Sequence, residues 1–291
     1  VGCSGIIYVL VERITCEDDC PASSVRRVVT SRQSMTTATV YQSDLNGHKW
    51  VGRRFHCPSE FPSAWVTGKL TSVLSRVESD HRPVCCELAL ADGSLRMLIE
   101  SIQPPRPLWI FGAGDDAIPL AVMADQLGWA VTVVDHQASR LTGERFPNAS
   151  LVCEPWNSAV ERLSPSRRTA AVLMTHSLTA DRILLPRLLD TSVGYVGVLG
   201  PKSRTGRMIE QLYAAGAMPD FDSLDRLHTP LGLDIGASIA PEIAVAIVGE
   251  IIALDNGRNG GSLQQRQAPI HEPVRHELID LVSVYEDTSS P

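Results

Sequence analysis

Residues 107–135 carry the pattern that most restricts how this chain can fold. An apolar run at 108–111 leads into the turn Gly112-Ala113-Gly114, and a second apolar run at 131–134 ends at Asp135. This order is typical of a dinucleotide-binding βαβ unit, in which a strand, a glycine-rich turn, a helix, a second strand and an acidic residue follow one another. Gly112 permits the tight turn, Gly114 lets a diphosphate approach helix N–H groups, and Asp135 accepts ribose hydroxyls, which favours NAD over NADP.

The pattern around this unit predicts an α/β protein with two domains. Strand-like and helix-like segments alternate over 105–255, which predicts a Rossmann-like parallel sheet with helices on both faces. Residues 1–104 are instead β-rich and predict a smaller α+β domain, which we expect to lack its N-terminal part because the chain starts at Val1 within a strand-like segment. The prolines of 104–107 mark the boundary. Residues 256–291 are expected to form a polar tail.

The expected elements follow the apolar periodicity of the chain. Strands are expected at 6–11, 38–41, 50–52, 84–90, 95–99, 108–111, 131–134, 170–174 and 194–199, and helices at 120–127, 181–189, 203–215 and 241–254. Asn46-Gly47 and Asp92-Gly93 are predicted hairpin turns.

Composition excludes several classes of protein. The 291 residues carry a formal charge of −7, so there is no basic field for nonspecific binding of nucleic acid. No apolar run approaches the roughly 18 residues that a membrane span needs. The seven cysteines are an odd number without a CxxC pair, which suits reduced thiols. We therefore expect a cytoplasmic protein without nucleic-acid partners or a membrane span.

Residues that directly follow strands are the main site candidates, because parallel α/β sheets bind ligands at the carboxyl ends of their strands. Asp115 and Asp116 follow the glycine turn, where their charges would repel a pyrophosphate. Two interpretations stay open. Either a divalent cation bridges one of these acids to a phosphate, or both acids cap the following helix.

Thr175 and His176 follow the apolar run at 170–174. His176 is a candidate general acid or base, or a ligand-binding group, because imidazole titrates near neutral pH; a structural histidine is the alternative. Asp234 lies among spaced glycines, where it could cap a turn or orient His176.

Lys202, Ser203 and Arg204 open the helix expected at 203–215. Backbone N–H groups at a helix start, together with cationic side chains, can cradle an anion. The alternative is a solvated basic helix face.

Gly2 and Gly5 flank Cys3 closely, which leaves a thiol accessible to a bulky cofactor or a sulfur donor. A buried, inert cysteine is the alternative. Cys16 and Cys20 could share a metal ion, but no second close pair completes four ligands, so no metal site is predicted.

With these motifs the chain resembles the XdhC/CoxI family, the accessory factors of xanthine dehydrogenase and related molybdenum hydroxylases. The matching segments, in order, are 2–7, 9–12, 100–105, 110–114, 144–147, 174–176, 195–200, 231–237 and 241–244. The resemblance implies an N-terminal XdhC/CoxI-type domain at 1–104 and a Rossmann-like domain at 105–255.

The resemblance also implies a function. Such a protein binds molybdenum cofactor (molybdopterin), supports its sulfuration by a cysteine desulfurase and delivers it to a molybdenum hydroxylase client, as a chaperone rather than an enzyme. Cys3 falls in the family's glycine-flanked cysteine motif and is the candidate contact to molybdenum or sulfur. Asp115 stands where many members have His, and Ser177 where Asn or Asp is common, which leaves open a paralogue with another client. A homodimer is expected, because strand edges of the first domain would otherwise be unpaired.

Two other functions remain open from the residues alone. An NAD-dependent oxidoreductase would use Asp135 on the ribose and His176 as a proton relay. A nucleotide-phosphate enzyme would hold Mg²⁺ on Asp115 and Asp116.

Overall fold

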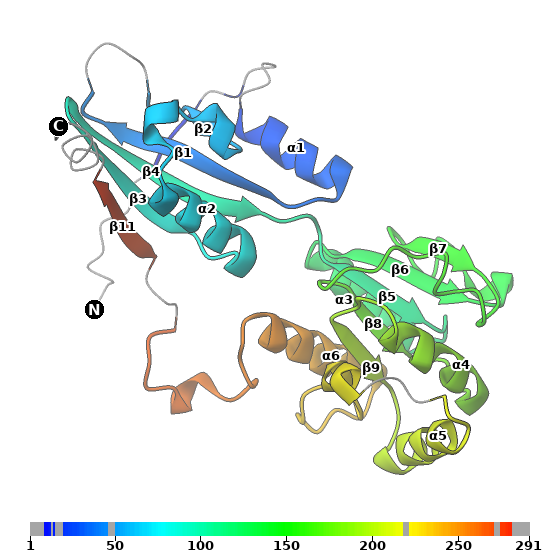
Figure 1. Cartoon of the computed structure of the whole chain (residues 1–291). Helices are drawn as coiled ribbons and strands as arrows, with labels where there is room; N and C mark the ends of the chain where they lie inside the picture. Colours follow the sequence, from blue (N-terminus) through cyan, green and yellow to red (C-terminus); the bar gives the residue numbers. More distant parts are fainter. Residues whose placement is uncertain are drawn as a thin grey trace. The chain divides into compact units, whose positions relative to one another are not determined.

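A computed structural model of the chain describes residues 9–12, 14, 20–45, 50–217, 221–270 and 274–280 (Figure 1). The chain divides into two compact units. Unit 1 comprises Val1–Pro104 with Ala268–Pro291, and unit 2 comprises Pro105–Gln267. Within the described ranges, no helix is both long and apolar enough to cross a membrane.

Unit 2 contains a six-stranded, fully parallel sheet with the order β10-β9-β8-β5-β6-β7. The strands are β5 (Pro107–Phe111), β6 (Ala130–Asp135), β7 (Ser150–Cys153), β8 (Ala170–Leu173), β9 (Tyr195–Val198) and β10 (Leu227–His228). The chain starts in the middle of the sheet, builds outward in one direction and then in the other, which is the strand order of a Rossmann fold. The Rossmann-like prediction is therefore confirmed, although β7 and β10 were not expected from the sequence.

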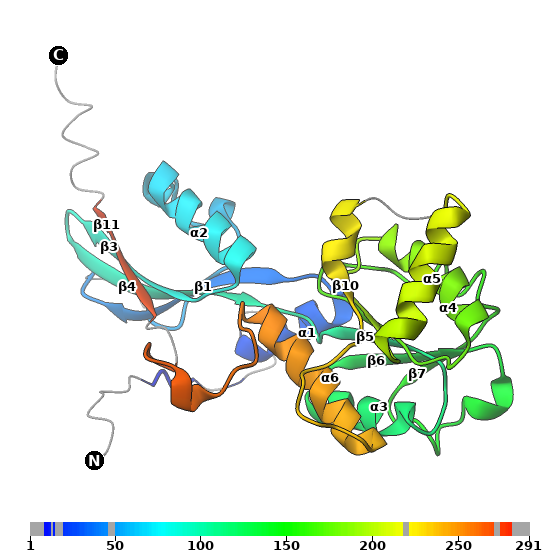
Figure 2. The ribbon, with the colours of Figure 1, turned by 90° about the horizontal axis from the view of Figure 1, so that it is seen from below.

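Helices cover both faces of this sheet (Figure 2). Side chains alternate along β5, so that Leu108 and Ile110 pack in one core with α3 and α6, and Trp109 and Phe111 pack in another with α4 and α5. The helices are α3 (Ala117–Gln126), α4 (Leu178–Leu189), α5 (Lys202–Ala214) and α6 (Ala240–Asp255), with 3-10 turns η3 (Ala138–Arg140), η4 (Phe221–Arg226) and η5 (Leu263–Gln265). All four helices match the expected ones to within a few residues.

Unit 1 contains a five-stranded sheet with the order β11-β3-β4-β1-β2, in which β11 runs parallel to β3 and the other neighbours are antiparallel. The elements are α1 (Pro21–Ser31), β1 (Met35–Ser43), β2 (Arg54–Phe55), η1 (Pro58–Glu60), η2 (Ser63–Trp65), α2 (Gly68–Asp80), β3 (Val84–Leu90), β4 (Gly93–Ile102) and β11 (Arg275–Asp280). Helix α2 presents Leu70, Val73 and Val77 to the core that contains Met97 and Ile99. These buried residues of β4 alternate with partly exposed ones, among them Arg96, Leu98 and Glu100, so the opposite face of the strand carries both polar and apolar side chains.

The strands expected at 38–41, 84–90 and 95–99 are confirmed, as is the β3–β4 hairpin, where Leu90 pairs with Gly93 and Gly93 has a φ of +144°. Two expectations were wrong. Residues 50–52 lie in a turn before β2, and residues 275–280, expected in a polar tail, form β11 of this sheet. Of the strand expected at 6–11, residues 6–8 lie outside the described residues and residues 9–11 form no strand; the Asn46-Gly47 turn also lies outside the described residues.

Candidate functional site

The glycine turn after β5 packs directly against the end of β8. Gly112 has a φ of +109°, and a Cβ at this position would lie 2.4 Å from the carbonyl oxygen of Met174. Only glycine tolerates both the left-handed backbone and this close approach. The predicted tight turn is confirmed, and the adjacent strand is a second reason for the glycine.

Gly114 faces a charged pair instead of open space. A Cβ on Gly114 would lie 2.6 Å from the Asp116 Oδ1 atom and 4.0 Å from the His176 Cδ2 atom. The Nε2 atom of His176 lies 2.6 Å from the Oδ2 atom of Asp116. Asp116 and His176 therefore lie next to the backbone at Gly114, where the sequence predicts that a diphosphate binds.

The Asp116–His176 pair joins the ends of β5 and β8. Asp116 stands at the N-cap of α3 but makes no side-chain capping bond, so the capping interpretation is wrong for this residue. His176 adopts a left-handed backbone with a φ of +54°, which is uncommon outside glycine and often marks a functional position. Its side chain is 62% exposed, so the ring remains open to a ligand from solvent.

A cation that the sequence analysis missed stands beside the glycine turn. Arg145 donates from Nη2 to the Asp115 Oδ1 atom at 2.8 Å and to the Ala113 carbonyl at 3.0 Å. Asp115 is 91% exposed, so this pair is solvated and stabilises little. Arg145 lies in the matching segment 144–147, which was the available signal for its importance.

Asp135 holds the same turn from the other side. Its Oδ2 atom accepts the Ala113 N–H at 2.8 Å, its Oδ1 atom accepts the Gln137 N–H at 2.9 Å, and the residue is 2% exposed. Asp135 thus clamps the glycine turn to the end of β6. Its contact with a ribose stays a prediction.

Arg204 is not the free cation that the sequence predicted. It donates to the Asp181 Oδ2 atom at 2.5 Å and to the Leu199 carbonyl at 2.9 Å. Asp181 is 1% exposed and also accepts a hydrogen bond from the Thr175 hydroxyl. Burial raises the pKa of Asp181, while the Thr175 hydrogen bond and the Arg204 charge oppose the rise. From the sequence, Asp181 was expected only as part of a helix, yet its carboxylate fixes the loops that carry Thr175 and Arg204.

Lys202 and Ser203 are exposed in the first turn of α5. Asp234 is exposed too, and makes no side-chain hydrogen bond with the part of the chain that the structure describes. Asp116, and not Asp234, orients His176. Gly2, Cys3, Gly5 and Cys16 lie outside the described residues. Among those that are described, no group of three His, Cys, Asp or Glu residues is arranged to hold a metal ion.

The loop around Asp234 is anchored by Glu250 of α6. The Glu250 Oε2 atom accepts the Tyr195 hydroxyl at 2.5 Å and the Gly232 N–H at 2.8 Å, and the ring of His228 stacks on that of Tyr195 at 4.5 Å. Burial pushes the pKa of Glu250 upward, but hydrogen bonds from His228, Tyr195 and Gly232 hold it below its usual value. This network braces the edge of the sheet beside the candidate site.

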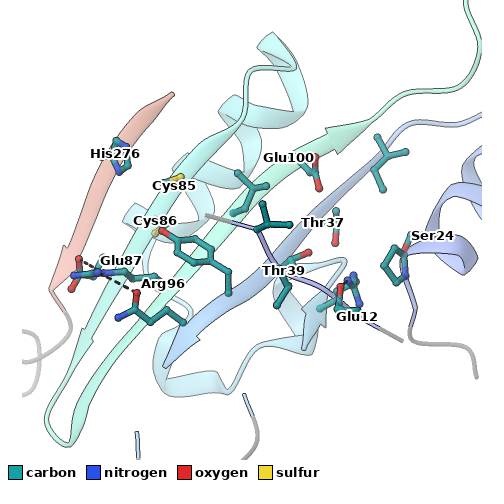
Figure 3. Close-up of a pocket in the computed structure, with 18 of the residues that line it drawn as sticks. Glu12, Ser24, Thr37, Thr39, Cys85, Cys86, Glu87, Arg96, Glu100 and His276 are labelled. Carbon is teal, nitrogen blue, oxygen red and sulfur yellow. Dashed lines mark hydrogen bonds and ion pairs between the residues drawn. The ribbon is translucent and has the colours of Figure 1, made fainter. Parts of the chain in front are cut away.

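Unit 1 contains a separate cavity of about 1010 Å³ on the sheet face opposite α2 (Figure 3). Its floor is formed by alternate residues of β1, β3 and β4, among them Thr37, Cys85 and Glu100, and α1 contributes Ser24 to its wall. This cavity was not predicted from the sequence, although the polar Arg96 and Glu100 stand at positions of β4 that alternate with its buried residues.

The parallel sheet, its glycine turn and the cluster at its carboxyl edge define a Rossmann-type domain combined with an α+β unit. The model of the XdhC Rossmann domain family matches residues 108–251. The chain is 30% identical over 252 residues to a Bacillus subtilis (strain 168) protein described as a probable subunit of xanthine dehydrogenase, and the match covers 86% of this chain and 70% of that protein. The chain therefore belongs to the XdhC family.

Two further similarities agree with this assignment. The chain is 30% identical over 190 residues to the uncharacterized protein YqeB of Escherichia coli (strain K12), and this match spans 64% of the chain but only about a third (34%) of YqeB. A solved structure described as a xanthine dehydrogenase from Bacillus halodurans aligns with a TM-score of 0.50 and 19% identity, over 84% of this chain and 97% of that one. At this identity the structural match concerns the fold alone.

Proposed function

We propose that this protein is a cytoplasmic accessory factor that binds molybdenum cofactor, supports its sulfuration by a cysteine desulfurase and delivers it to a xanthine dehydrogenase-type hydroxylase. The observation that carries the proposal is the similarity over 252 residues to the B. subtilis protein named for xanthine dehydrogenase. A maturation role agrees with this relationship, because the chain belongs to the family of accessory factors.

The carboxyl edge of the unit 2 sheet would bind a phosphate-bearing ligand, with little affinity for a bare dinucleotide. Either Arg145, beside the glycine turn, or Lys202 with Ser203, at the start of α5, would hold the phosphate of the cofactor. Asp116 repels a diphosphate from the backbone at Gly114. The donor set therefore fits one phosphate at the rim better than a diphosphate on the turn.

The remaining roles fall to Cys3 and His176. Cys3, with Gly2 and Gly5, would contact molybdenum or the incoming sulfur. His176 would hold or release a proton at Nε2, the atom that faces Asp116. When bound, the cofactor itself supplies the metal that accepts sulfur. A homodimer is part of the proposal, and the outer edge of β11 is not paired by any described strand.

An NAD-dependent oxidoreductase is the second candidate, favoured by the strand order and by the glycine turn. It predicts stoichiometric, tightly bound NAD(H). The burial of Asp135 and the position of Asp116 both argue against it.

One experiment separates these functions. The protein is produced in cells that make molybdenum cofactor and purified, and its ligand is identified by mass spectrometry of the pterin and by metal analysis. We expect pterin and molybdenum. NAD(H) without either would establish the second candidate and refute the first.

A further inference from the structure

The cavity of unit 1 contains a buried hydroxyl that lacks a hydrogen-bond partner. Thr37 is 2% exposed, and its Oγ1 atom contacts no donor or acceptor within the described part of the chain. A buried polar group left in this state costs about 1–3 kcal/mol. A ligand in the cavity would satisfy the hydroxyl.

Glu100 lies directly opposite Thr37 in the β1–β4 register, and both side chains line the cavity (Figure 3). The other lining acids have cationic partners: Glu12 pairs with Arg54, Glu87 with Arg96, and Glu277 with Arg76. The carboxylate of Glu100 makes no hydrogen bond or ion pair with any described residue. The cavity floor therefore offers one carboxylate and one adjacent hydroxyl to a ligand.

The Glu100 carboxylate and the Thr37 hydroxyl call for a ligand that carries hydrogen-bond donors. A carboxylate with two free oxygens accepts two parallel N–H bonds, and the neighbouring hydroxyl either donates or accepts a third. Since Arg54 and Arg96 are already paired, a phosphate would find no free cation among them. Leu10, Val25 and Leu98 add apolar wall, and the volume suits a drug-sized molecule.

We propose that this cavity binds a planar heterocycle through its 2-aminopyrimidinone edge, with Glu100 as the acceptor of the ring and amino N–H groups and Thr37 as the adjacent partner. Pterins and guanines share this edge. The choice of a pterin rests on the proposed function, in which the protein binds molybdenum cofactor, whose ring system is a pterin.

The test is a fluorescence titration of the full chain with 6-hydroxymethylpterin, with guanosine and adenosine as competitors. Glu100→Gln removes the charge at constant shape and is expected to weaken pterin binding at least about tenfold, since hydrogen bonds to charged groups are the stronger ones. Thr37→Val is expected to weaken binding severalfold while the protein stays folded. Glu78→Gln, on the exposed side of α2, is the matched control and should bind like the wild type.

The outcomes separate this inference from the proposed function. If Glu100→Gln and Thr37→Val both bind pterin like the wild type, or if the wild type binds none, the cavity assignment is wrong even where molybdenum cofactor co-purifies. If pterin binding depends on Glu100 but no cofactor co-purifies, the cavity assignment stands and the proposed function fails. Tighter binding of guanosine than of pterin would show that the ring is not a pterin. Competition by adenosine, which lacks the 2-aminopyrimidinone edge, would show that the cavity does not recognise this edge.

Discussion

His176 and Asp116 form a pair 2.6 Å apart that lies over Gly114, in the place where a dinucleotide fold ordinarily admits a diphosphate. The two residues are far apart in sequence and meet because β5 and β8 are neighbours in the sheet. We expect the pair to disfavour a diphosphate at this glycine turn, because the Asp116 carboxylate and a diphosphate carry charges of the same sign.

Removing the Asp116 charge should therefore improve diphosphate binding. We expect Asp116→Ala to bind ADP about fivefold more tightly than the wild type, because a charge a few Å from a phosphate costs about 1 kcal/mol when partly screened. Calorimetric titration at low salt measures the change. Asp190→Ala is the control, since Asp190 is exposed at the C-terminal end of α4 and has no part in the glycine turn. Equal affinity of the wild type and Asp116→Ala would show that Asp116 does not guard the turn.

Two glycines of unit 2 should respond oppositely to alanine. Gly112→Ala places a Cβ 2.4 Å from the Met174 carbonyl at a φ of +109°, and we expect a loss of about 2 kcal/mol or more. Gly206→Ala fills open space within α5 and should stabilise unit 2 by about 0.5–1 kcal/mol. Hydrogen exchange of β5 and α5 peptides reports both. A stable Gly112→Ala protein would mean that the turn can move away from β8.

The sequence predicted unit 2 well because its evidence is local. Each strand is a short apolar run, each helix has its own periodicity, and the glycine turn marks the first crossover. What could not be predicted is pairing across long separations. β11 joins β3 from the far end of the chain, and a polar stretch such as 275–280 carries no local sign of its partner.

The sequence predicted which loops form the candidate site, but not which side chains in those loops pair with one another. Sequence reasoning selected the loops at Asp116, His176 and Arg204, because they follow strands. It could not tell that Asp116 orients His176, or that Arg204 is occupied by the buried Asp181. Such pairings depend on strand order and on side-chain reach, which periodicity does not report.

Arg204 should contribute most to the stability of unit 2 at pH values above the pKa of Asp181, where Asp181 is charged. Burial raises the pKa of Asp181 in the folded state, so the native protein binds this proton more tightly than the unfolded chain does. The buried charge therefore costs stability above that pKa, and the cost falls as the pH falls through it. Arg204 offsets the cost.

We expect Arg204→Met to lose about 3 kcal/mol at about pH 8 and much less at about pH 5. Hydrogen exchange of α4 and α5 peptides measures the difference, with the exposed Arg207→Met as the control. A deficit that does not shrink toward acid pH would show that Arg204 acts by packing alone.

Glu250 should show the opposite dependence on pH. Its pKa lies below the usual value because His228, Tyr195 and the Gly232 N–H hydrogen-bond to it, despite burial that pushes the other way. Its stabilising contribution is therefore present above the unfolded pKa and lost as the pH falls through the folded one. Glu250→Gln should destabilise unit 2 by about 1–3 kcal/mol at neutral pH, and the difference from the wild type should shrink below about pH 4.5. Exchange rates of β9 and β10 peptides across this range test it, with the exposed Glu144→Gln as control. A difference that persists unchanged into acid would mean that the Glu250 hydrogen bonds do not require its charge.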